Sequence, residues 1–192
     1  ASRYDFANRV LSLGLCVGWR EQLVAATKAA QPKTVADLAT GSGDVAFALR
    51  RDLPGDCSIV GYDFCEPMLE LGRVRAQKEG VTLEFKTGDC MALPIADASQ
   101  DVVTIAYGVR NFEHLEKGLS EILRTLKPGG QFIILETSVP TTFPFKQGYY
   151  VYTNFIMPTI GKLFSKDKKA YQYLSTSAQN FPFGEALNNI LR

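Results

Sequence analysis

The apolar run from Thr34 to Ala39 leads almost directly into Gly41-Ser42-Gly43, and a segment with helical periodicity begins at Asp44. Two glycines separated by one residue let the backbone turn sharply and approach a ligand closely. A helix that begins after such a turn directs unpaired N–H groups at the ligand, which suits an anionic group. The pattern therefore predicts a strand, a ligand-binding loop containing Gly41 and Gly43, and a helix.

Asp37, near the end of the predicted strand, bears on which ligand the loop holds. Gly41, Gly43 and Ala46 also fit the loose dinucleotide pattern Gly-x-Gly-x-x-Gly/Ala. A carboxylate at this place would repel a pyrophosphate, but it can bind an ammonium group directly or through water. S-adenosylmethionine carries an ammonium group and a dinucleotide does not. Asp37 therefore favours S-adenosylmethionine.

Two further acids follow predicted strands. Asp63 ends the run that starts at Ser58, twenty positions after Gly43, where a ribose-binding carboxylate is expected. Asp89 follows the next apolar run and has a suitable position for the exocyclic amine of an adenine. Each aspartate alone can be an ordinary loop or helix-capping residue. Three at successive strand ends indicate a nucleoside site.

Strand-length apolar runs alternate with helical segments, which predicts an α/β fold with a mostly parallel sheet and helices on both faces. We expect one domain, 1–192, with a helical segment at 1–30, a cofactor-binding core at 31–139 and an aromatic-rich helical cap at 140–192. The aromatic side chains of the cap either wall a pocket or pack against the sheet. The predicted strands are 34–39, 58–62, 81–86, 101–106 and 131–136; the predicted helices are 12–30, 44–51, 66–79 and 115–126, with a turn at 127–130.

Composition narrows the functional classes. A net charge of +1 over 192 residues gives no general reason to expect a nucleic-acid partner. Four cysteines without a Cys-x-x-Cys pair, together with one histidine, argue against a metal site. No run of eighteen apolar residues occurs, so any membrane contact is expected to be peripheral. We expect reduced thiols and a cytoplasmic location, at the inner face of the membrane if the protein contacts one.

The chain resembles the class I S-adenosylmethionine-dependent methyltransferases, which have a Rossmann-like fold, and within them the ubiquinone/menaquinone biosynthesis C-methyltransferase family. The resemblance covers nearly the full length. The blocks most specific to the family are Tyr4-Asp5 with Trp19-Arg20, and Tyr107-Gly108-Val109-Arg110-Asn111. The other matching blocks are Asp37 to Asp44, Gly61-Tyr62-Asp63, Gly88-Asp89, Leu126-Lys127-Pro128-Gly129-Gly130, and Glu136 before Pro140.

The resemblance implies methyl transfer from S-adenosylmethionine, leaving S-adenosylhomocysteine, to a ring carbon of a polyprenylated quinol in respiratory quinone biosynthesis. Demethylmenaquinol and a ubiquinol precursor both remain open as the substrate. Family cofactor positions carry over to Ser42, Asp63, Asp89, Cys90 and Ala106. The family often has Thr at position 42 and Ser at position 106; Ser42 keeps the hydroxyl, whereas Ala106 lacks it. Family members also continue into a terminal strand pair, which we expect to be missing from this sequence.

Ring methylation requires an electron-rich ring, which a quinol acquires when a hydroxyl ionises. Arg110 is expected to stabilise the phenolate, and Asn111 to hold the substrate oxygen or a water. Tyr107 and Tyr149 complete the predicted substrate site. The base that removes the ring proton stays open among Asp5, Tyr107 and solvent, and His114 is interpreted as a solvated residue at a helix start.

Two alternatives from other classes remain at this point: an NAD(P)-dependent oxidoreductase with a Rossmann domain, and a non-catalytic nucleoside-binding subunit. Homodimerisation, or membership of a quinone-biosynthesis complex, is also open.

Overall fold

A computed structural model of the protein describes residues 14–138, 140, 142–153, 181–182 and 184–191. Residues 15–136 form one compact unit, and the described residues from 137 onward belong to a second. The two units are described separately.

The first unit is a five-stranded sheet with the strand order β3-β2-β1-β4-β5, and all four strand pairings are parallel. The predicted α/β fold is therefore confirmed. The strands are β1 (Thr34–Leu38), β2 (Ser58–Asp63), β3 (Glu84–Thr87), β4 (Gln100–Ala106) and β5 (Leu126–Leu135); the helices are α2 (Leu15–Ala29), α3 (Asp44–Asp52), α4 (Glu66–Glu79) and α5 (Leu115–Thr125), with a 3-10 turn, η1, at Val109–Asn111.

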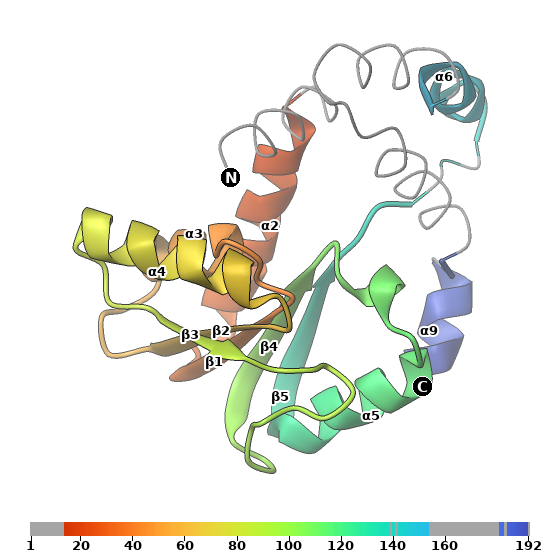
Figure 1. The fold of residues 1–192 in the computed structure, drawn as a ribbon. Helices are drawn as coiled ribbons and strands as arrows, with labels where there is room; N and C mark the ends of the chain where they lie inside the picture. The colour runs from red at the N-terminus through yellow and green to blue at the C-terminus, as the bar shows by residue number, and fades with distance from the viewer. Residues whose placement is uncertain (1–13, 139, 141, 154–180, 183, 192) are drawn as a thin grey trace. The chain divides into compact units, whose positions relative to one another are not determined.

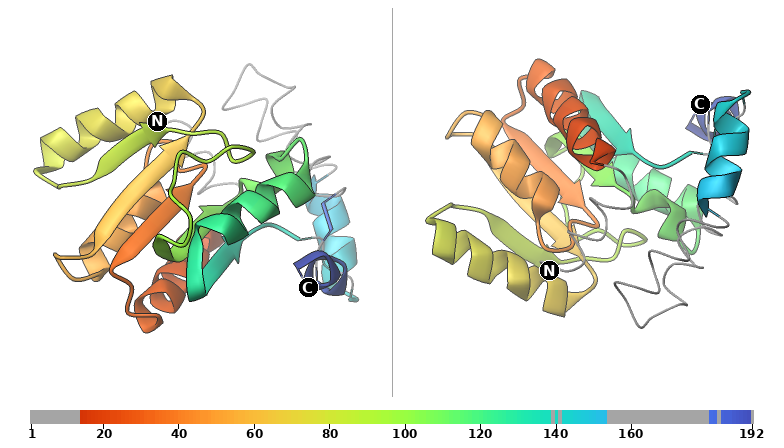
Figure 2. Two further views of the ribbon diagram at one scale, coloured as in Figure 1. Left: turned by 90° about the horizontal axis from the view of Figure 1, so that it is seen from below. Right: turned by 90° about the horizontal axis from the view of Figure 1, so that it is seen from above.

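Helices cover both faces of this sheet, as the alternating pattern predicted. Helices α2, α3 and α4 lie on one face and α5 lies on the other (Figure 1). Figure 2 shows the two faces from opposite sides. The side chains of Leu38, Leu49, Leu69 and Ile105 are buried completely between these layers. The central strands are buried on both faces, which explains their continuous apolar sequence.

The third strand begins later than predicted, at Glu84 and not at residue 81. Gly80 takes a left-handed conformation with φ +65° as the C-cap of α4, and the N–H of Val81 donates to the carbonyl of Ala76 at 2.9 Å. The backbone of Val81 therefore belongs to the C-terminal cap of α4 and cannot pair with a strand. The Val81 side chain packs against the core.

The predicted turn at 127–130 instead lies within β5. The register advances from Leu126 to Gln131 on β5 while it advances only from Gln100 to Val102 on β4. The extra residues form a bulge in which Gly129 has φ +81°. The strand resumes in register beyond it, so the turn-type composition produces an irregularity inside one strand.

The second unit contains α6 (Phe145–Val151) and α9 (Glu185–Leu191), in agreement with the helical character predicted for this region. Tyr149 lies on α6. Most of the predicted aromatic cap, including 154–180, lies outside the described residues, as do residues 1–13 with Asp5. Within the described ranges, no helix is both long and apolar enough to cross a membrane.

Candidate cofactor and substrate site

The order in which strands are added to the sheet reverses between β1 and β4. Strands β2 and β3 lie on one side of β1, and the later strands β4 and β5 lie on the other. Ligands of open α/β sheets bind outside the carboxyl ends of the strands at such a point. Ala39 and Tyr107, immediately after these two strands, have φ values of +49° and +58°. Residues other than glycine rarely adopt this backbone conformation, so both loops at the switch point contain backbone strain.

The loops after β1 and β4 approach each other closely. A Cβ atom on Gly108 would lie 2.6 Å from the Cβ of Ala39, so only glycine fits there. Gly43 at the start of α3 has φ +88°, and a Cβ atom on it would lie 2.6 Å from the ring of Phe85. The glycines are therefore required by close packing as well as by backbone conformation.

Asp37 is enclosed beneath the glycine loop, with 1% of its surface exposed. Its Oδ2 accepts a hydrogen bond from the Thr40 hydroxyl at 2.6 Å, and its Oδ1 accepts one from the Thr104 hydroxyl at 2.7 Å. Burial raises the pKa of Asp37 to about 6, despite these hydrogen bonds and one from the backbone of Ala46.

Both carboxylate oxygens of Asp37 accept hydrogen bonds within the protein, from Thr40 and Thr104. Asp37 thereby joins β1 to β4 and to the glycine loop. Its contact with a ligand ammonium group, directly or through water, stays a prediction.

Asp63, at the end of β2, is next to the same loop. Its Oδ2 accepts a hydrogen bond from the Gly41 N–H at 2.8 Å, and its Oδ1 accepts one from the Cys65 N–H at 2.9 Å. A carboxylate oxygen has two acceptor sites, so each oxygen can still accept a hydroxyl hydrogen bond. The predicted ribose-binding acid is thus joined directly to the predicted glycine loop.

Asp89 and Cys90 follow β3 on the neighbouring strand end. The N–H of Gly88 donates to the carbonyl of Asp63 at 3.0 Å, which fixes this loop beside Asp63. Burial, with smaller contributions from Asp89 and Asp63, raises the pKa of the Cys90 thiol to about 12, and its thiol also interacts with the backbone of Ala39. Asp89 is exposed, and its Oδ1 accepts from the Met91 N–H at 2.8 Å. The structure brings the predicted nucleoside residues together.

The predicted substrate residues follow β4. The Arg110 guanidinium forms an ion pair with Glu136, at the end of β5, and the two side chains are only 8% and 7% exposed. Arg110 Cζ lies 6.0 Å from the centre of the Tyr107 ring. Burial, with a smaller contribution from the charge of Glu136, raises the pKa of Tyr107 to about 12. The Tyr107 hydroxyl is buried and has no hydrogen-bond partner among the residues that the structure describes.

The other predicted positions are less tightly held. Asn111 is exposed, and its Nδ2 donates weakly to the Tyr107 carbonyl at 3.5 Å. Ala106 is the last residue of β4. Tyr149 belongs to the second unit, so its predicted role next to the substrate stays a prediction. His114 is exposed at the N-cap of α5, as interpreted from the sequence.

Two residues at this edge were given no role from the sequence. Glu136 was predicted as the last residue of the final strand; it directly follows β5, and its carboxylate is the partner of Arg110. Phe64 follows Asp63 and is 79% exposed, which is unusual for a large apolar side chain. The position of an apolar side chain directly after the predicted ribose-binding acid could have indicated a role for Phe64 in the cofactor site.

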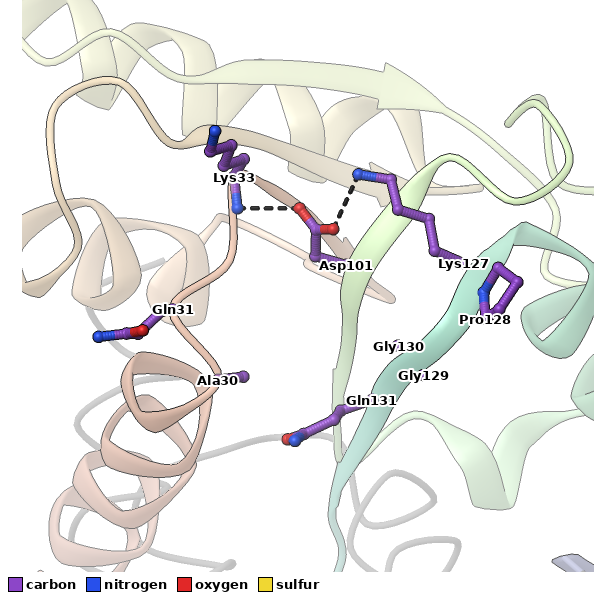
Figure 3. A pocket seen from close by; sticks show the side chains of 9 residues that line it. All are labelled: Ala30, Gln31, Lys33, Asp101, Lys127, Pro128, Gly129, Gly130 and Gln131. Carbon is purple, nitrogen blue, oxygen red and sulfur yellow. Dashed lines mark hydrogen bonds and ion pairs between the residues drawn. The ribbon is translucent and has the colours of Figure 1, made fainter.

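The opposite, amino-terminal edge of the sheet contains a separate cavity of about 310 Å³ next to the β5 bulge (Figure 3). Asp101 accepts a hydrogen bond from the Lys33 N–H at 2.9 Å and pairs with Lys127 Nζ at 2.8 Å. This cavity lies at the wrong end of the strands to be part of the cofactor site. In the part of the chain that the structure describes, no group of His, Cys, Asp and Glu side chains is arranged to hold a metal ion.

A solved structure shares this fold. A solved putative methyltransferase from Bacillus halodurans is 25% identical, with a TM-score of 0.56 over 82% of this chain and 68% of that one. The strand order, the glycine loop and the acids at the strand ends define a class I S-adenosylmethionine-dependent methyltransferase.

Sequence comparison identifies the family within this class. The family model described as "ubiE/COQ5 methyltransferase family" matches residues 1–192, and the chain belongs to that family. A demethylmenaquinone methyltransferase of Bacteroides fragilis is 42% identical over 100% of this chain and 78% of its own length. A ubiquinone/menaquinone biosynthesis C-methyltransferase of Geotalea daltonii is 44% identical over 95% of this chain and 78% of its own length. The two alternative interpretations, an NAD(P)-dependent oxidoreductase and a non-catalytic nucleoside-binding subunit, are therefore not supported.

Proposed function

We propose that this enzyme transfers a methyl group from S-adenosylmethionine to a ring carbon of a demethylated, polyprenylated quinol. Relatives named as demethylmenaquinone and ubiquinone/menaquinone methyltransferases support a quinol substrate. The observation that carries the proposal is the position of Arg110, a buried guanidinium that follows β4 beside the switch point. Its charge suits an oxygen anion on the substrate.

The residues at the strand ends fit S-adenosylmethionine, which supplies an electrophilic methyl group on a sulfonium when bound. Asp63 has acceptor sites left for ribose hydroxyls. Gly41, Ser42 and Gly43 provide a loop that a ligand can approach closely, and Phe64 offers an exposed apolar surface beside Asp63 for the adenine. We assign Asp89, Cys90 and Ala106 to the same site.

Arg110 has the main task on the substrate side. A phenol has a pKa of about 10, so ionising a quinol hydroxyl at neutral pH costs about 4 kcal/mol. A nearby permanent cation lowers that cost, because it favours the phenolate over the neutral hydroxyl. Arginine is itself a poor proton acceptor, so we assign Arg110 to phenolate stabilisation and orientation of a water. Asn111 and Tyr107 would hold the substrate oxygen or that water.

Exclusion of water would assist the transfer, since an anionic carbon nucleophile and a cationic sulfonium lose charge as they react. The aromatic residues after Pro140, with Tyr149 among them, are proposed to cover the quinol ring. The isoprenoid tail of such a substrate favours contact with the membrane surface, and we propose a cytoplasmic location at the inner face of the membrane. A homodimer or a quinone-biosynthesis complex is compatible with this function.

Mass spectrometry tests the proposal directly. Chemically reduced demethylmenaquinol and a reduced ubiquinol precursor are each incubated with the enzyme and S-adenosylmethionine labelled in its methyl group. One labelled methyl on the ring of either quinol is expected, and its identity selects the branch. Labelling of neither quinol would contradict the proposal. A thermal shift caused by NAD and not by S-adenosylmethionine would contradict the assigned cofactor class.

A further inference from the structure

The ion pair between Arg110 and Glu136 joins the loop after β4 to the end of β5. The neighbouring residues are joined as well, because the Tyr107 N–H donates to the Leu135 carbonyl at 2.8 Å. Glu136 therefore has a fixed origin, directly after the last residue of a paired strand. A carboxylate on a rigid element can hold a guanidinium in one orientation through charge-assisted hydrogen bonds.

Stability alone does not explain why this pair is buried. Removing an arginine and a glutamate from water has a large desolvation cost, and packed apolar residues often replace such pairs without loss of stability. Other Arg–Glu pairs of the first unit are more exposed: Arg124 and Glu121, for example, are 30% and 22% exposed. The buried pair lies where the substrate oxygen is proposed to bind.

The charges of the pair act on the same neighbour. Glu136 raises the pKa of the Tyr107 hydroxyl and Arg110 lowers it, in addition to the larger effect of burial. Arg110 also lies over the Tyr107 ring. Rotation of the guanidinium would therefore change the position of positive charge relative to both Tyr107 and a bound phenolate.

We infer that Glu136 is a positioning residue for methyl transfer, which acts by fixing the Arg110 guanidinium toward the substrate oxygen. This inference rests on the proposed function and assigns a role at the same site. Glu136 itself does not need to touch the quinol. Its effect on transfer should therefore depend entirely on the presence of Arg110.

A double-mutant cycle tests this dependence with the quinol that the labelling experiment selects. The variants are Glu136→Gln, which removes the charge at nearly constant size, Arg110→Ala, and the combination of both. Glu121→Gln makes the same chemical change at the Arg124 pair and is the matched control. The measurements are kcat, the KM for S-adenosylmethionine and the thermal shift produced by S-adenosylhomocysteine.

Glu136→Gln is expected to lower kcat by about tenfold or more, with the cofactor KM and the thermal shift unchanged. In the Arg110→Ala background the same change should alter kcat by less than about twofold. Glu121→Gln should keep the kcat of the wild type. Equal losses in both backgrounds, or a kcat for Glu136→Gln equal to that of the control, would overturn the inference while the proposed function stands.

The same measurements distinguish a purely structural role of Glu136 from the positioning role. If Glu136 only stabilises the fold, the variant should have a lower melting temperature but normal kcat at a temperature where it is folded, which also overturns the inference. Glu136→Asp, which keeps the charge, should recover part of the lost kcat. Wild-type enzyme that labels no quinol would overturn the proposed function and this inference together.

Discussion

Two aspartates of one sheet have opposite electrostatic environments. Asp37, towards the carboxyl end of β1, is buried, and its pKa is raised to about 6. Asp101, towards the amino end of β4, pairs with Lys127 and accepts backbone hydrogen bonds from Lys33 and Thr34, which lower its pKa to about 2. Burial thus disfavours the charged form of the aspartate at the carboxyl edge, whereas hydrogen bonds and the Lys127 ion pair stabilise the charged form of the aspartate at the amino edge.

Buried charge follows the same division, but backbone strain does not. Ala39 and Tyr107 have positive φ values at the carboxyl edge, where the Arg110–Glu136 pair is also buried. At the amino edge, Gln31 and Ala98 have positive φ values as well, of +49° and +46°. The difference teaches that buried charge, and not backbone strain, distinguishes the edge assigned to ligand binding. Each prediction below has a control elsewhere in the first unit.

The largest effect is expected for Gly43→Ala. The new Cβ atom would lie 2.6 Å from the Phe85 ring and would force a residue other than glycine to keep φ +88°. Overpacking and the left-handed backbone together should lower the free energy of unfolding by about 4 kcal/mol. Gly129→Ala has φ +81° but no atom within 4 Å, so it should lose only about 1 kcal/mol. Equal losses of unfolding free energy in the two variants, measured by urea unfolding, would contradict a cost from the close contact with Phe85.

Asp37→Asn should change how stability depends on pH. Since the pKa of folded Asp37 is raised to about 6, its favourable contribution is complete below pH 4 and is lost as the pH rises through 6. The wild type should therefore lose about 2 kcal/mol relative to the variant between pH 4 and pH 7. Unfolding free energies of both proteins at several pH values check this.

Asp101→Asn provides the opposite sign. Because the pKa of Asp101 is lowered, the wild type is expected to be more stable than the variant at pH values above the usual pKa of an aspartate. This difference in stability is lost as the pH falls toward 2. The effect should be smaller because solvent screens the partly exposed pair. The same sign for both substitutions would contradict the comparison of the two edges.

Arg110→Ala should lower kcat for quinol methylation by about 100-fold, because one charged donor to the developing oxygen anion is removed. The thermal shift produced by S-adenosylhomocysteine should remain. Lys127→Ala removes a cation at the amino edge and should leave kcat unchanged. Unaltered kcat in Arg110→Ala would exclude the residue from the mechanism.

Phe64→Ala should weaken binding of S-adenosylhomocysteine by about 1 kcal/mol, or roughly fivefold in Kd, because apolar contact area with the adenine is lost. Calorimetric titration measures this change. Leu123→Ala, on the exposed side of α5, is the control, since Leu123 is 73% exposed and distant in sequence from the cofactor loops. An unchanged Kd for Phe64→Ala would place the adenine elsewhere.

Local patterns were sufficient to predict most of the fold and the shared sheet edge of the predicted cofactor residues. The apolar run before Gly41 became β1, and Asp63 and Cys90 met the loop because parallel strands end at the same edge. The start of β3 was missed because a helix cap and a strand start look alike when an apolar residue such as Val81 follows a glycine.

The partners of the charged groups could not be predicted in this way. Asp37 is enclosed by Thr104, which is 67 positions away, and Arg110 pairs with Glu136, which is 26 positions away. Such contacts depend on which strands become neighbours and on their register, and neither is visible in a local pattern. For that reason the hydrogen bonds of Asp37 within the protein interior were not predicted from the sequence.

The central pairing of the sheet has a kinetic consequence. Val35 of β1 pairs with Val102 of β4, so the two strands that carry the glycine loop and Tyr107 become neighbours only across a long stretch of chain. Contacts of such large sequence separation slow folding, because the entropy of the intervening loop is lost before the contact is gained. During synthesis the binding crevice can therefore close only after β4 has left the ribosome, and until then β1 has one edge open to other chains.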